Sequence, residues 1–170
     1  MSTLSMSNAM SAVPTMLTNL EHVLRKAEAN IEERSLDADV ILNARLAPDM
    51  WPLKKQVSTI AALGKNAPYR VADQEPPNYE GGENTFAELY ALLAQAKADI
   101  AKVSAADLDG QEDREFSLSM GPREMDFTGM SYLSGFTIPN MLFHVTTVYN
   151  ILRHNGVPLG KIDFFGGAPK

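Results

Sequence analysis

The sequence contains no cysteine among its 170 residues. Disulfide frameworks, zinc ribbons, iron–sulfur clusters and thiol nucleophiles are therefore excluded, and three histidines remain for imidazole chemistry. Positive charge is also scarce, because 15 lysines and arginines stand against 21 aspartates and glutamates, which gives a formal net charge of −6. Nucleic-acid binding needs a basic surface that neutralises phosphates, so we expect no nucleic-acid partner.

Long apolar runs are absent as well. No segment approaches the roughly 18 consecutive apolar residues of a membrane-spanning helix, so we expect no membrane partner. The first basic residue is Arg25, so the amino terminus lacks the basic segment that a secretory signal needs, and a cytoplasmic location is expected. Hydrophobic residues make up 45% of the chain, and this composition and length suit one soluble domain spanning residues 1–170.

Apolar residues recur three and four positions apart between Val13 and Ile31, which predicts a first long amphipathic helix. Pro14 suits the first turn of that helix, because proline lacks the N–H that the first turn leaves unpaired. The upstream segment Leu4–Met10 could extend the helix with a local kink, and the sequence leaves both possibilities open.

A short helix is expected after Asp37, whose carboxylate suits an N-cap, and it should stop before Pro48. A second long helix is expected to begin between Pro48 and Pro52 and to run to about Val71, with an end made less certain by Pro68. Its apolar residues again share one face, which should pack against the first helix.

Residues 73–84 show no hydrophobic period and contain a proline pair and a glycine pair. This composition predicts a long exposed loop. Thr85 should then cap a third long helix, and Glu88, three positions later, completes the capping-box pattern that marks a helix start.

The hydrophobic period changes from 3.6 to 2 in residues 115–128, where apolar and polar residues alternate on both sides of Gly121–Pro122. This change predicts a β-hairpin. Pro139 should then open a fourth long helix, which Gly156 ends. The predicted fold is all-α: an antiparallel four-helix bundle with at least one crossover loop and a short β-hairpin inserted before the last long helix.

Four polar residues fall on the apolar faces of the predicted helices. At 100° per residue, Asp49 and Gln56 face the bundle from the second long helix, provided that the helix includes Asp49. Asn140 and His144 face it from the fourth. A buried carboxylate needs a partner, because an unpaired one costs roughly several kcal/mol. His22, in contrast, points away from the apolar stripe of its helix and should be exposed.

Two interpretations of these inward residues stay open. In the first, they form a hydrogen-bond network that fixes how the second and fourth helices pack. In the second, an Asp49–His144 pair orients the imidazole as a general base, and Asn140 and Gln56 hold a small polar ligand. We take these four residues as the candidate ligand-binding site, and we assign no catalytic residue, metal ligand or cofactor.

Several blocks of the sequence resemble one bacterial family. They are residues 42–50 (LNARLAPDM), Pro52-Leu53, Gln56, Pro139-Asn140 and residues 143–156 (FHVTTVYNILRHNG). In order and spacing these blocks are similar to the bacterial domain of unknown function numbered nineteen ninety-three, from about Met6 to Phe165. That family resembles the DinB/YfiT-like four-helix bundles, so the resemblance implies this fold and a homodimer.

The DinB-like pattern implies three histidines that bind a divalent metal, one from the second helix and an H-x-x-x-H pair from the fourth. The resemblance places His144 at the second histidine of the pair and Asn140 at the first, so the pair is incomplete here. The ligand from the second helix corresponds to Asp49 or Gln56. We therefore expect a homodimeric DinB-like protein whose polar cluster binds a small ligand. The alternative is a divalent-metal-dependent transferase or hydrolase of the DinB/thiol-S-transferase kind.

Overall fold

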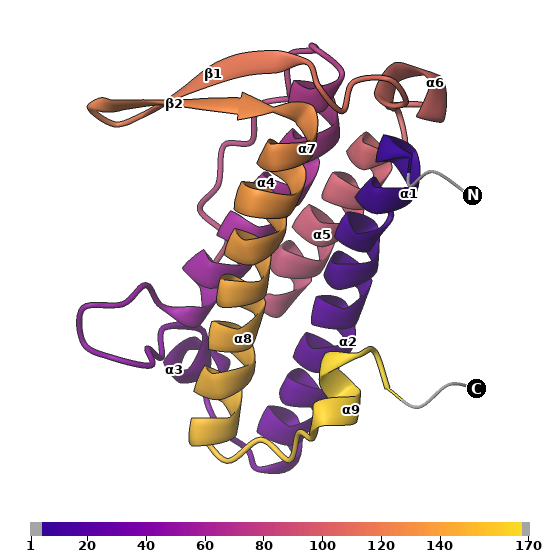
Figure 1. The fold of residues 1–170 in the computed structure, drawn as a ribbon. Coiled ribbons are helices and arrows are strands. Elements are labelled where there is room, and N and C mark those ends of the chain that lie inside the picture. The colour runs from indigo at the N-terminus through magenta and orange to yellow at the C-terminus, as the bar shows by residue number, and fades with distance from the viewer. Residues whose placement is uncertain (1–4, 168–170) are drawn as a thin grey trace.

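The computed structural model describes residues 5–167, and four long helices form its framework (Figure 1). They are α2 (Ala12–Glu33), α4 (Leu53–Val71), α5 (Phe86–Ile100) and α8 (Ile138–His154). The shorter elements are α1 (Met6–Met10), α3 (Ala38–Leu42), α6 (Ala105–Leu108), β1 (Glu115–Met120), β2 (Arg123–Thr128), α7 (Gly129–Ser131), η1 (Tyr132–Thr137) and α9 (Lys161–Phe164). A helical bundle with one short hairpin confirms the fold class that the sequence predicts.

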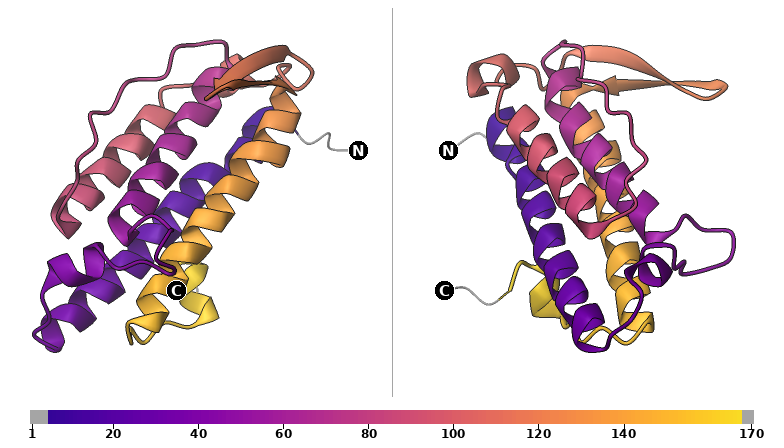
Figure 2. Two further views of the ribbon diagram at one scale, coloured as in Figure 1. Left: turned by 90° about the vertical axis from the view of Figure 1, so that its left-hand side faces the viewer. Right: turned by 180° about the vertical axis from the view of Figure 1, so that it is seen from behind.

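The chain runs down α2, up α4, up α5 and down α8 in the orientation of Figure 1. α4 and α5 are therefore parallel neighbours, and residues 72–85 connect them by crossing the outside of the bundle (Figure 2). A bond between the last turns of these two helices fits this direction, since the Tyr69 hydroxyl donates to the carbonyl oxygen of Asp99 at 3.1 Å. The predicted exposed loop is thus the crossover of the bundle.

The core lies between the four long helices and is built from their apolar stripes. On α2 the buried residues are Val13, Leu17, Leu20, Val23, Leu24, Ala27 and Ile31. Three helices approach one another closely at Gly64 of α4, where a Cβ atom would lie 3.2 Å from Val13 Cγ1 and 3.3 Å from Met141 Cε. A larger side chain would push α4 away from α2 and α8, because the core is already close-packed.

The amino-terminal segment is a short helix of its own. α1 ends at Met10, and Ser11 separates it from α2, in which Pro14 lies in the first turn. Met6 and Met10 are buried against the core. The helix therefore extends upstream with a break, as one of the two alternatives proposed, and Leu4 lies outside the described residues.

The chain is already helical before the last long helix begins. Thr128 caps α7 by accepting from the Ser131 N–H at 3.1 Å, and the chain stays helical through the π-helical turn η1 into α8. In that turn the Ile138 N–H donates to the carbonyl of Leu133, five residues back. α8 itself begins at Ile138 with Pro139 in its first turn, as the sequence predicts, whereas the sequence pattern does not indicate the helical turns before it.

The hairpin closes one end of the bundle. Its strands pair from Glu115 opposite Thr128 to the turn, and Phe116 lies opposite Phe127. Both rings pack edge-on against Tyr132, with centroid distances of 5.3 and 5.4 Å. These aromatic contacts fix the hairpin to η1. Within residues 5–167, no helix has the length and apolar character that crossing a bilayer requires.

Candidate functional site

The seam between α4 and α8 contains the closest contact among the candidate residues. Gln56 lies in the first turns of α4 and is 2% exposed, and His144 lies in the middle of α8 and is 8% exposed. His144 Nδ1 and Gln56 Oε1 are 2.6 Å apart, which is a short hydrogen bond between two buried side chains. Two of the four predicted site residues are therefore brought together as expected.

The direction of this hydrogen bond follows from the second contact of Gln56. Its side-chain Nε2 donates to the carbonyl oxygen of Trp51 at 3.0 Å, so Oε1 is the atom that faces the imidazole. A carbonyl oxygen only accepts, so His144 Nδ1 carries the proton. In a neutral imidazole the other nitrogen, Nε2, then holds a lone pair. The site thus offers one fixed hydrogen-bond acceptor.

The imidazole is also held neutral. Burial lowers the pKa of His144 below its ordinary value, because desolvation disfavours the charged form. No carboxylate contributes to this shift, which fits a site without an Asp–His pair. At neutral pH the Nε2 atom of His144 is therefore available as an acceptor.

Two aromatic rings flank the imidazole and reach the surface. The Trp51 ring lies parallel to it, with an interplanar angle of 6° and centroids 5.9 Å apart. The Phe143 ring meets it edge-on at 5.3 Å. Trp51 is 50% exposed and Phe143 is 57% exposed. Sequence reasoning missed Trp51, because its contact depends on the path of the loop before α4 and not on a helical period.

Asp49 does not face the bundle. α4 begins at Leu53, and Asp49 is an exposed residue of a turn in which the Met50 N–H donates to the carbonyl of Ala47 at 3.0 Å. The prediction that Asp49 points inward is wrong, because a helical projection applies only to residues inside the helix. Pro52 stands at the N-cap, so the helix excludes Asp49.

Asn140 lies one turn before His144 on α8 and is half-buried. Its side-chain Nδ2 donates to the carbonyl of Phe136 on the same helical segment at 3.0 Å. This bond directs the amide nitrogen along its own helix. Asn140 therefore lies one turn from His144 on the same helix, and its side-chain hydrogen bond to Phe136 is not part of the His144–Gln56 pair.

The donor set does not fit the three-ligand metal site of DinB-like proteins. Among residues 5–167, no group of three or more histidines, aspartates and glutamates is placed to hold a metal ion. At this site His144 is the one strong nitrogen ligand, both polar ends of Gln56 are already hydrogen-bonded, and Asp49 is outside the helix. Neutral amides are weak ligands for zinc or nickel, so these residues do not form such a site.

His22 is less exposed than its helical projection predicts. Its Nε2 lies 3.2 Å from Asp163 Oδ1, and the same carboxylate oxygen accepts from Lys26 Nζ at 2.7 Å. The ammonium of Lys26 and a backbone N–H from Gly160 hold the pKa of the Asp163 carboxyl at about 2. His22, which the sequence predicts to be exposed, has a side chain that is 36% exposed, because α9 folds back onto α2 and Asp163 contacts the imidazole.

Two comparisons with known proteins give matches over most of this chain. A family model described as a domain of unknown function (DUF1993) matches residues 7–165. The crystal structure of a DinB family member protein from Shewanella denitrificans is 36% identical in sequence and superposes with a TM-score of 0.85. That match covers 95% of this chain and 91% of the other. Comparison with curated proteins gives no match.

Proposed function

The chain belongs to the DUF1993 family and has a DinB-like bundle fold, and from this premise we propose that it works as a homodimer that binds a small polar ligand beside His144. The observation that carries this proposal is the uncharged, aromatic surface around His144 on α8. This surface supports a binding function better than it supports a catalytic one.

The outer face of α8 differs from the rest of the surface in its lack of charge. Residues 128–152 contain no lysine, arginine, aspartate or glutamate, although 21% of the whole chain is charged. The exposed positions of this face are Pro139, Leu142, Phe143, Thr146 and Asn150. Protein interfaces are enriched in aromatic residues and depleted of acidic residues and lysine, so this face has the composition of an interface.

A second copy of the chain is the partner that this charge distribution favours. Each copy carries a net charge of −6, so two copies repel unless they meet through a surface without acidic groups. The exposed positions of α8 around Phe143 satisfy that condition. Association there would cover both exposed rings beside the imidazole of His144.

The ligand that suits this site is a small neutral molecule with an N–H or O–H donor. His144 Nε2 supplies the acceptor, and the Gln56 bond holds the ring in place. The stacked Trp51 ring gives one apolar wall. A cation would gain little here, since the imidazole is neutral and no carboxylate pairs with it.

The test of the dimer is the mass in solution of the wild-type protein and two variants. We expect a dimer for the wild type by light scattering and sedimentation, and at least tenfold weaker association for Phe143→Glu. Met125→Glu is the matched control, because Met125 is also an exposed apolar residue but lies on the hairpin. A monomeric wild type, or equal weakening by both variants, contradicts the proposal.

The test of the site is a nitrogen NMR spectrum of the histidine side chains. We expect His144 to show a protonated Nδ1 and an unprotonated Nε2, and acetamide and other small neutral amides to shift Nε2 in a saturable way. His144→Phe should abolish this response, and His154→Phe, an exposed change on the same helix, should not. Stoichiometric binding of Zn²⁺ that depends on His144 would favour the metal-dependent alternative instead.

A further inference from the structure

A second candidate site lies at the other end of α4, beside the hairpin. There the last turns of α4, residues 73–78 of the crossover loop and strand β1 enclose a cleft of about 500 Å³. Its lining includes Lys65, Arg70, Arg114, Glu75, Phe116 and Leu118. Gln56 is near the start of α4 and Arg70 is near its end, so this cleft is separate from the His144 site.

Lys65 is the most buried cation of the cleft. The residue is 5% exposed, and its Nζ donates to the carbonyl of Pro77 and lies 4.0 Å from the centroid of the Tyr79 ring. Tyr79 is held in turn by Asp99, whose Oδ2 accepts from the Tyr79 hydroxyl at 2.8 Å. The crossover loop therefore packs against Lys65, and among residues 5–167 no carboxylate oxygen is in contact with its ammonium.

Arg70 is the second cation and has a neutral partner. Its Nη1 donates to the Tyr132 hydroxyl at 3.0 Å. Within residues 5–167, neither Lys65 nor Arg70 has a carboxylate oxygen within the 4.0 Å of an ion pair. The pKa of Lys65 is lowered from its ordinary value, mainly by burial and also by the charge of Arg70, whereas the charge of Asp99 opposes this shift. Two like charges thus influence each other beside an open space.

Arg114 has a different role from the other two cations. Its guanidinium donates to the carbonyl of Val71 at 3.2 Å, to the carbonyl of Arg70 and to Asp73 Oδ1 at 3.2 Å. These bonds satisfy the last carbonyls of α4, which a helix end leaves unpaired. Arg114 and Asp73 neutralise each other, so they form a wall of the cleft and add no net charge.

The remaining charge of the cleft is positive. Lys65 and Arg70 contribute two positive charges, and Glu75, an exposed residue, contributes one negative charge. In a chain with a net charge of −6, such a local excess of positive charge is unusual. Holding like charges near each other costs electrostatic energy, and a bound anion would offset this cost.

We propose that this cleft binds a small molecule through its oxyanion, a carboxylate or a phosphate, with Lys65 and Arg70 as the two cationic contacts. Arginine suits this task, because its planar N–H groups match two oxygens at once. The half-buried side chains of Phe116 and Leu118 form an apolar wall for the rest of the molecule. The site does not depend on the function proposed for His144.

The test is an NMR titration of the whole chain at constant ionic strength, with sodium benzoate and inorganic phosphate as probes and sodium chloride as the reference. We expect saturable shifts of the backbone amides of residues 73–78 and 116–118 with at least one probe. Tighter binding of benzoate identifies a carboxylate ligand, and tighter binding of phosphate identifies a phosphate ligand. Shifts that do not saturate, or that chloride reproduces, overturn the proposal.

Five variants distinguish anion binding in the cleft from a general effect of the charge of the protein. Arg70→Gln and Lys65→Met should each weaken binding at least tenfold, and Arg70→Lys, which keeps the charge, should weaken it less than Arg70→Gln. Arg123→Gln is the matched control, because it removes one exposed guanidinium from the hairpin turn outside the cleft. Tyr132→Phe removes the partner of Arg70 but no charge, so it should still bind. Equal binding by Arg70→Gln and the wild type overturns the proposal, even if Lys65→Met does not fold.

Discussion

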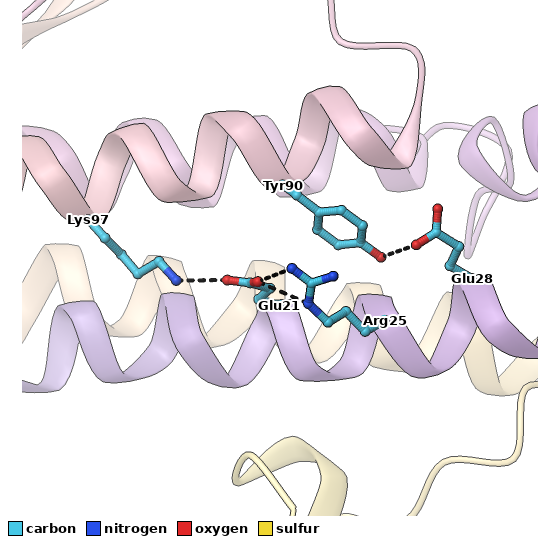
Figure 3. Close-up of polar contacts among 5 residues, drawn as sticks. All are labelled: Glu21, Arg25, Glu28, Tyr90 and Lys97. Carbon is cyan, nitrogen blue, oxygen red and sulfur yellow. Dashed lines mark hydrogen bonds and ion pairs between the residues drawn. The ribbon is translucent and has the colours of Figure 1, made fainter.

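Two of the seams between antiparallel helices in this bundle are built from different chemistry. In the seam between α2 and α5, charged side chains lie along the edge (Figure 3). Glu21 of α2 accepts from Lys97 of α5 at 2.7 Å and from Arg25 of its own helix. Two turns farther along, the Tyr90 hydroxyl donates to Glu28 at 2.8 Å. These groups remain in partial contact with water.

The seam between α4 and α8 uses a neutral pair instead. His144 and Gln56 are buried, uncharged and 2.6 Å apart, and the carbonyl of Trp51 completes the chain of hydrogen bonds. Outside this pair, the aromatic rings of Trp51 and Phe143 reach the surface, and residues 128–152 of the chain carry no charged side chain. The difference follows from burial, because water screens the charges of an exposed edge, while a buried seam must satisfy every polar atom internally.

The comparison shows how much stability each seam loses when one partner of a polar contact is removed. An exposed ion pair contributes little when present and costs little when lost, typically about 0.2–1 kcal/mol. A buried hydrogen-bonded pair contributes modestly but costs more when one partner is removed, because the other is left unsatisfied. The α4–α8 seam is therefore the more fragile of the two, although it has fewer polar contacts.

The largest effect is expected from removing one member of the buried pair. Gln56→Leu leaves the His144 Nδ1–H and the Trp51 carbonyl without their partner, so the free energy of unfolding should fall by about 2 kcal/mol. Urea unfolding measures this loss. The double variant Gln56→Leu/His144→Leu is the control and should recover part of it, since both polar groups of the pair are then absent. A loss no larger than that of an exposed ion pair would show that the seam is not sensitive to burial.

A smaller effect on the free energy of unfolding is expected from a change of pH. The two seams should lose their contributions to stability in different pH ranges. Because burial lowers the pKa of His144 in the folded state, the unfolded chain binds a proton first as pH falls below the ordinary value of 6.5. The contribution of His144 to stability is then lost as pH falls from 6.5 toward the folded pKa. In the other seam, the Lys97 ammonium lowers the pKa of Glu21, so its contribution is lost only below the ordinary value of 4.5.

Urea unfolding at a series of pH values measures both windows. His144→Leu should flatten the dependence of stability on pH just below 6.5 and leave the part below 4.5 unchanged. Glu21→Gln should flatten the dependence of stability on pH below 4.5 and leave the part just below 6.5 unchanged. The assignment fails if His144→Leu shows the same slope as the wild type just below pH 6.5.

The local part of the fold follows from the sequence because its causes are local. The capping box of Thr85 and Glu88 forms as predicted, with both reciprocal bonds present, and α5 begins there. The hairpin and the crossover loop also follow from the change of period and from paired prolines and glycines. Each of these features depends on residues a few positions apart, which a single sequence displays.

The candidate site is predictable only in part. The helical period places Gln56 and His144 correctly, because both lie well inside regular helices. It fails for Asp49, where two nearby prolines leave the helix start open. Trp51 and Lys65 could not be found this way, because a loop that no period describes supplies the contact in each case. The extent of one soluble domain over residues 1–170 stays a prediction.

The smallest effect is expected from the charged seam. Lys97→Met removes the cation that contacts Glu21 and keeps most of the apolar length of the side chain, so it should cost no more than about 1 kcal/mol. Arg25 remains beside Glu21 in this variant, which limits the loss further. Because salt screens partly exposed charges, the difference between wild type and variant should shrink when urea unfolding is repeated at about 1 M NaCl, where the Debye length is about 3 Å. The cost of Gln56→Leu should not change with salt, since that pair is neutral and buried. If salt reduces both costs equally, the contrast between the two seams does not arise from burial and charge.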